Sequence, residues 1–250
     1  MMTGPVVDTP SALEFQREIM DRISEAEMQD IAADLDRKSV ALRDLLSGEP
    51  SLLDRATLRQ VLRWVFATRR RADRILDSMG PQPLAAAIAE LLAAGDPVAE
   101  RIDRFDGALT GLAAVAAFAG SGFDLPAELL HFTSPDRYWL WTRWIWDPDA
   151  RTGALALVTT DDVDLSAGAT RGAVYLTVGR AMAFVDGTGK AAGFTAAGPG
   201  LFGVDVFLAA IYGVYMYTIL RMRMTREFNR VVPPLPHLVR HLLGVRHLEG

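Results

Sequence analysis

The residue types that most often carry catalysis or bind metals are scarce in this chain. Its 250 residues include no cysteine, which excludes thiolate metal sites and cysteine nucleophiles. Two of the four histidines, His237 and His241, are four residues apart, a spacing that places both imidazoles on one face of a helix. No acidic third ligand lies near them in the sequence, and no nucleotide-binding motif is present. We therefore predict neither a metal site nor a cofactor.

Arginine supplies almost all of the positive charge. The chain has 26 Lys+Arg residues, of which only Lys38 and Lys190 are lysines, and its formal net charge is −5. Two basic segments, 55–74 and 221–246, lie within an otherwise acidic sequence. Arginine suits binding because its planar guanidinium holds a phosphate or carboxylate with two hydrogen bonds, although the codon bias of a GC-rich genome would also enrich it. The candidate binding residues of the first segment are Arg63, Arg69, Arg70 and Arg74.

A Gly-Ser-Gly tripeptide, formed by Gly120, Ser121 and Gly122, separates two stretches of helical pattern. Glycine permits positive φ in a tight turn and allows a partner to approach the backbone closely. The N–H groups at the start of the following helix can then contact a phosphate. The tripeptide, together with Arg137 after the second stretch, therefore adds further candidate binding residues.

Four of the five tryptophans fall within eight residues, at positions 139, 141, 144 and 146. On a helix they would occupy two opposite faces, and an element that is apolar all round is either buried or part of an interface. Both interpretations stay open. If the segment is an interface, Trp139 and Trp141 are its candidate binding residues.

The pattern of helix, Gly-x-Gly and helix is similar to that of the helix-hairpin-helix DNA glycosylase superfamily. Three further segments resemble the family: Leu-Arg-Trp at 62–64 with the arginine pair at 69–70, the apolar 129–132 with Pro-Asp-Arg-Tyr at 135–138, and Val-Asp-Val-Phe-Leu at 204–208. The resemblance covers about residues 54–220. It implies an orthogonal multi-helix domain with a helix-hairpin-helix element, and the excision of bases from DNA.

The chain departs from this family where the chemistry should lie. The catalytic aspartate of the family lies about one turn beyond the Pro-Asp-Arg element, and Thr142 occupies the matching position. The lysine of its bifunctional members is also missing, because no lysine lies between Lys38 and Lys190. If the chain is an enzyme of this kind, Asp136 and Asp147 are the candidates to supply the carboxylate, although nothing in the sequence requires either.

These observations favour a non-catalytic helical binding or accessory protein over an enzyme. We expect it to act through a protein partner or as a homo-oligomer, and weakly through nucleic acid. The alternative is a DNA N-glycosylase-like enzyme with a displaced catalytic carboxylate.

The elements that must position these residues are predicted to be almost entirely helical, so the expected fold class is all-α. Ser24 begins a capping box, Asp54 precedes an apolar stripe, and Gly80 with Pro81 stops the helix that follows. Further helices are predicted at 84–94, 103–119, 174–185 and 204–229. The stretch 154–159 allows at most one short strand, and the glycine-rich 187–203 is predicted to be a loop.

Three segments are predicted along the chain: an acidic helical segment at 1–50, a helix-hairpin-helix-like domain at 51–230, and a proline-rich link with a terminal helix at 231–250. The most apolar uncharged stretch, 206–220, is shorter than the roughly 17–25 residues that cross a bilayer. The first residues lack the pattern of a secretory signal. We therefore expect a cytoplasmic protein with no membrane span.

Overall fold

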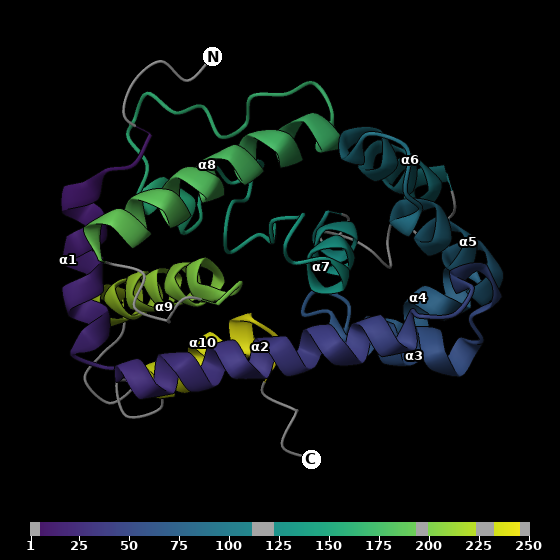
Figure 1. The fold of residues 1–250 in the computed structure, drawn as a ribbon, viewed down its shortest axis with the longest axis horizontal. Helices are drawn as coiled ribbons and strands as arrows, with labels where there is room; N and C mark the ends of the chain where they lie inside the picture. Colours follow the sequence, from purple (N-terminus) through teal and green to yellow (C-terminus); the bar gives the residue numbers. More distant parts are fainter. Residues whose placement is uncertain (1–5, 112–122, 194–199, 224–232, 246–250) are drawn as a thin grey trace. The chain divides into compact units, whose positions relative to one another are not determined.

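The computed structural model describes residues 6–111, 123–193, 200–223 and 233–245, and these residues form an all-α fold (Figure 1). They contain no strand, and their only β-type pairings are isolated bridges between Val7 and Thr159 and between Asp147 and Thr152. The prediction of an all-α class is therefore confirmed. The α-helices are α1 (Thr9–Met20), α2 (Glu25–Leu45), α3 (Arg55–Trp64), α4 (Ala72–Met79), α5 (Pro81–Leu92), α6 (Val98–Gly111), α7 (Asp124–Thr133), α8 (Arg171–Ala192), α9 (Gly203–Arg223) and α10 (Leu235–Leu242).

The chain divides into two compact units. Unit 1 comprises Met1–Asp36, Arg143–Leu165 and Arg180–Gly250, and unit 2 comprises Arg37–Thr142 and Ser166–Gly179. The helices α2 and α8 each contribute residues to both units. This grouping differs from the three consecutive segments predicted from composition.

Unit 2 is built around α7, whose residues from Asp124 to Phe132 are all buried. Leu, Pro, Ala and Phe account for the burial of most of this helix, whereas Asp124, Glu128 and His131 form a polar stripe on one face that is also buried. The helices α5 and α6 both pack against α7. Asp54 caps α3 by accepting a 2.8 Å hydrogen bond from the N–H of Thr57. Gly80, with φ of +80°, joins α4 to α5 where the Gly-Pro stop is predicted.

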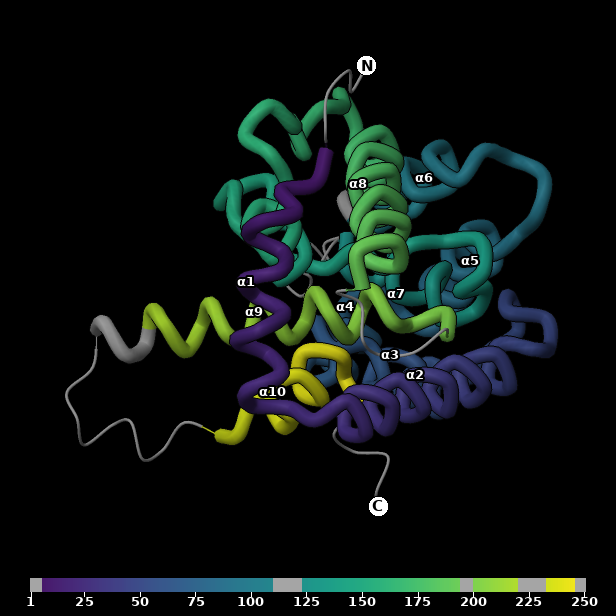
Figure 2. Tube along the Cα trace, turned by 60° about the vertical axis from the view of Figure 1, so that its left-hand side comes forward, coloured from purple at the N-terminus to yellow at the C-terminus, as the bar shows by residue number. Residues whose placement is uncertain are grey.

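Unit 1 is built around α9, which both α1 and α10 contact (Figure 2). The first half of α9 is almost wholly buried, as expected of the uncharged apolar stretch from Val206 onward, and Asp205 in its first turn is buried too. At the start of α2 the predicted capping box is present. The Ser24 hydroxyl accepts from the N–H of Glu27, and the Glu27 carboxylate accepts from the N–H of Ser24.

The stretch 154–159, which was expected to hold at most a short strand, contains the 3-10 helix η3 (Leu155–Leu157), and its Thr159 forms the isolated bridge with Val7. Two segments differ from expectation. The tryptophan-rich segment is not helical: 138–142 is irregular and 143–145 is a turn. The first six residues of the predicted loop 187–203 belong to α8, which continues to Ala192.

Within the described residues, none of the helices combines the length and apolarity that crossing a membrane requires.

Candidate functional site

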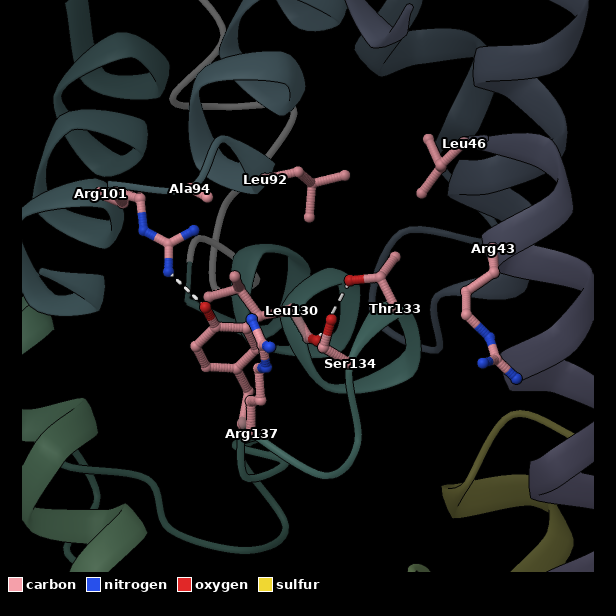
Figure 3. Close-up of a pocket in the computed structure, with 10 residues that line it drawn as sticks. Arg43, Leu46, Leu92, Ala94, Arg101, Leu130, Thr133, Ser134 and Arg137 are labelled. Carbon is pink, nitrogen blue, oxygen red and sulfur yellow. Dashed lines mark hydrogen bonds between the residues drawn. The ribbon is translucent and has the colours of Figure 1, made fainter. Parts of the chain in front are cut away.

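A pocket of about 240 Å³ lies in unit 2 (Figure 3). We call it the arginine pocket because three arginines from different elements line it. Its described lining residues are Arg43, Leu46, Leu92, Ala94, Arg101, Leu130, Thr133, Ser134, Arg137 and Tyr138.

Arg101, on α6, is the buried cation of the arginine pocket. Its guanidinium donates to the carbonyls of Leu91 (2.7 Å) and Ala93 (2.9 Å), and to the hydroxyl of Tyr138 (2.6 Å). Its Nε is buried and has no hydrogen-bond partner among the described residues. The residue is only 5% exposed, so water compensates little of its charge.

Arg137 and Tyr138 enter the pocket from the turn that follows α7. The Tyr138 hydroxyl accepts from Arg101, so its own proton is directed elsewhere. The Tyr138 carbonyl lies 2.8 Å from Nδ1 of His131, and since a carbonyl can only accept, this imidazole nitrogen donates. That bond fixes the turn against α7. The Arg137 side chain is 72% exposed and has only a long 3.9 Å contact with Asp136. In Figure 3, Arg101 and Arg137 lie at the same end of the pocket.

The opposite end of the pocket is formed by the last turns of α2, which carry Arg43 and Leu46 (Figure 3). Two buried polar contacts hold this part of α2 against α7. Lys38 Nζ lies 3.0 Å from the Glu128 carboxylate, and the Ser39 hydroxyl donates to the carbonyl of Phe132 at 2.7 Å. The position of Arg43 therefore depends on contacts made one and two turns earlier in its helix.

Glu128 is a buried carboxylate behind the pocket. Burial raises the pKa of Glu128, because the charged form loses hydration. Lys38 and the N–H of Phe66 act against this rise, since both stabilise the carboxylate. Lys38 Nζ also lies 4.0 Å from the centroid of the Phe132 ring, a cation–π contact.

Helix ends reduce the positive charge of the arginine pocket without cancelling it. Three lining segments, at Leu46, Leu92 and Thr133, are the C-terminal ends of α2, α5 and α7. Each C-terminus carries about −0.5 of an elementary charge. Against three guanidinium groups these ends supply about −1.5, so the pocket keeps a net charge of about +1.5. If the arginines served only to neutralise the three helix C-termini, fewer than three would suffice.

The described lining of the pocket offers groups that can bind an anion. It contains no carboxylate, histidine or lysine that could transfer a proton near neutral pH. It also contains no cluster of metal-ligating side chains, and none exists elsewhere among the described residues. The lining combines fixed positive charge, hydroxyl groups and leucine side chains.

The predicted binding arginines other than Arg137 lie outside this lining. Arg63 lies in the last turn of α3, Arg74 lies in α4, and Arg69 and Arg70 lie in the turn between these helices. Arg63, Arg70 and Arg74 are exposed, and Arg69 lies over the Phe66 ring at 4.5 Å. The structure therefore separates Arg137 from the other predicted arginines.

The tryptophans lie mostly in the interior. Trp141 is fully buried and stacks on Phe123 at 4.4 Å between ring centroids. Trp144 and Trp146 are 4% and 5% exposed. Trp139 is half-buried, and its carbonyl accepts from the hydroxyl of Tyr175 at 3.0 Å. Of the two interpretations of this segment, these positions support the core.

The remaining predicted site residues have no common site in the described structure. Gly120, Ser121 and Gly122 lie outside the described residues. Asp136 is exposed beside Arg137. Asp147 accepts from the N–H groups of Asp149 and Ala150, as the capping residue of a turn.

Sequence reasoning found Arg137 but missed Arg43, Arg101 and Tyr138. The Pro-Asp-Arg-Tyr element contains two of the pocket residues, Arg137 and Tyr138, but only Arg137 was predicted from it. Nothing in the sequence indicates that α2 and α6 would bring their arginines to the same pocket as this element.

Comparison of the chain with protein-family models, curated proteins and solved structures found no match.

Proposed function

We propose that this protein is a non-catalytic binding protein whose arginine pocket binds an anionic group, a carboxylate or a phosphate. The observation that carries this proposal is the environment of Arg101. A buried charge without a charged partner costs several kcal/mol, and no described carboxylate pairs with Arg101. A bound anion would supply the missing partner.

The other groups of the pocket support the same ligand chemistry. Arg137 carries a second charge at the same end, and its exposure leaves it accessible to a ligand. The hydroxyl proton of Tyr138 supplies a neutral donor. Hydrogen bonds to charged groups contribute about 1.5–3 kcal/mol each when well formed.

A small anion has more support than the protein partner expected from the sequence. That expectation depended on the tryptophan-rich segment, and Trp141, Trp144 and Trp146 are buried. The DNA glycosylase alternative gains no support either, because the hydrogen bonds of Asp147 are those of a turn cap.

Acetate and inorganic phosphate are the simplest probes of this proposal. We expect one or both to bind at millimolar concentration and to shift the Arg101 Nε–H resonance in NMR spectra. The variant Arg137→Gln should weaken binding about 5- to 10-fold, a value reduced from that of a buried charged hydrogen bond because Arg137 is exposed.

The matched control is Arg74→Gln, which removes an exposed arginine of the same unit outside the pocket lining. It should leave the affinity within twofold of the unmodified chain. Absence of binding for both anions, or equal loss in the two variants, would reject the arginine pocket as the site.

Nucleic acid is a second candidate ligand because Arg63, Arg70 and Arg74 are exposed and their side chains make no described hydrogen bond or ion pair. This surface is separate from the lining of the arginine pocket.

A further inference from the structure

We propose that the ligand of the arginine pocket is a short aliphatic monocarboxylate. This inference depends on the proposed function and specifies the ligand class. It follows from the local charge, the distribution of apolar side chains and the volume of the pocket.

Local charge favours a carboxylate over a phosphate dianion. Arg101 and Arg137 lie together at one end of the pocket (Figure 3). The C-terminal ends of α5 and α7 also line it, and each carries about −0.5 of a charge. Two guanidinium groups and two such ends leave about +1, which a single carboxylate neutralises. A dianion would leave uncompensated negative charge among helix carbonyls.

The rest of the pocket fits an apolar chain. Leu46 directly follows α2, Leu92 ends α5 and Leu130 lies in α7, and all three line the same space. Leu46 lies away from Arg101 and Arg137, toward the end of the pocket formed by α2 (Figure 3). A ligand whose carboxylate is bound by the two arginines would therefore place its chain along the leucines. This distribution of charged and apolar groups matches an amphipathic acid.

The volume limits the length of the chain. At about 240 Å³ the pocket is small, which favours a short-chain acid such as hexanoate. Drug-sized ligands occupy pockets of roughly 300–1,000 Å³ and are too large.

The test compares straight-chain carboxylates by calorimetric titration of the full chain. Burial of each methylene should tighten binding about 3-fold, so hexanoate should bind at least 10-fold more tightly than acetate. Chains longer than about eight carbons should gain less than 2-fold per added pair of carbons. Equal affinities for acetate and hexanoate would overturn the inference but leave the proposed anion site intact. Failure of acetate, phosphate and hexanoate alike would overturn both.

Head-group specificity is tested with ligands of similar length. Hexanoate should bind more than 10-fold more tightly than hexanol, which lacks the charge, and more tightly than butyl phosphate. Adipate carries a second carboxylate, but the exposed Arg43 at the far end is opposed by the C-terminus of α2, so adipate should bind no better than hexanoate. Tighter binding of adipate or butyl phosphate would overturn the monocarboxylate assignment.

A variant tests whether the aliphatic chain of the ligand lies along the leucines of the pocket. Leu92 is half-buried, so Leu92→Ser is expected to fold, which circular dichroism checks. It should weaken hexanoate about 5- to 10-fold and leave acetate unchanged. Leu176→Ser, at a partly exposed leucine of the same unit outside the lining, is the control and should change neither affinity. Equal weakening of acetate and hexanoate by Leu92→Ser would contradict the predicted orientation, as would no weakening of hexanoate.

Discussion

The two lysines of this arginine-rich chain both pair with carboxylates, in opposite environments. Lys38 and Glu128 are 3.0 Å apart, with side chains 0% and 2% exposed. Lys190 and Asp186 are 2.6 Å apart, and the lysine side chain is 59% exposed. Removal of one partner from a buried pair leaves an uncompensated charge, whereas an exposed charge is solvated by water. The two pairs should therefore respond very differently to substitution.

We predict that Glu128→Leu lowers the free energy of unfolding by about 3–5 kcal/mol, because it removes the carboxylate that lies 3.0 Å from the fully buried Lys38 ammonium. The double variant Lys38→Met with Glu128→Leu should recover most of this loss, since both buried charges are absent. Recovery should be incomplete because the N–H of Phe66 also loses its acceptor. Urea denaturation measures all three proteins.

The exposed pair provides the control. Asp186→Ala should cost less than about 1 kcal/mol. A loss for Glu128→Leu as small as that for Asp186→Ala would contradict the prediction, as would a double variant less stable than the single one.

At the residue scale, the sequence singled out one of the three pocket arginines. Arg137 was a candidate binding residue, and it lines the pocket. Arg43 and Arg101 could not be found this way, because they meet only through the packing of α2 and α6 around α7. A buried Lys38 was also unpredictable, since lysine is rarely buried without a partner and Glu128 lies 90 residues away.

At the element scale, helix boundaries set by local chemistry were predictable. The capping box at Ser24, the cap at Asp54 and the stop at Gly80 are present as expected. Errors arose where composition and tertiary packing disagree. The tryptophan segment is apolar enough for a buried helix, yet it crosses the interior in irregular conformation. Glycines at 187 and 189 suggested a loop, yet α8 continues through both.

Two glycines of α8 provide a prediction at this scale. A Cβ on Gly172 would overlap the backbone carbonyl of Ala99 on α6, and the N–H of Gly172 donates to the Asp103 carboxylate at 2.7 Å. Gly172→Ala should therefore destabilise the protein by about 3 kcal/mol, because two backbones must separate.

Gly187→Ala is the matched change in the same helix. No atom lies within 4 Å of a Cβ built there, apart from neighbours within the helix. Alanine should stabilise the protein by about 0.5–1 kcal/mol, because glycine loses more backbone entropy in a helix. Thermal unfolding followed by circular dichroism measures both variants. Destabilisation by Gly187→Ala would indicate that α8 ends before this residue.

At the scale of the whole molecule, the net charge of −5 conceals one uneven region. Residues 51–80 contain seven arginines against three aspartates. Asp77 pairs with Arg55, Asp73 pairs with Arg59, and Asp54 caps α3. All three carboxylates are therefore engaged, and Arg63, Arg70 and Arg74 remain exposed without a described partner for their side chains.

We predict weak, sequence-independent binding of duplex DNA through these three arginines. If each contacts one phosphate, log K should fall with log salt concentration at a slope of about −2.7. The triple variant Arg63→Gln, Arg70→Gln, Arg74→Gln should remove most of the binding and most of the slope in fluorescence anisotropy at low salt. The control triple, Arg17→Gln, Arg151→Gln and Arg180→Gln, makes the same change in net charge at other exposed arginines. It should keep the slope close to that of the unmodified chain. Equal loss in the two triple variants would mean that only net charge matters, and absence of binding at low salt would exclude DNA as a ligand of this surface.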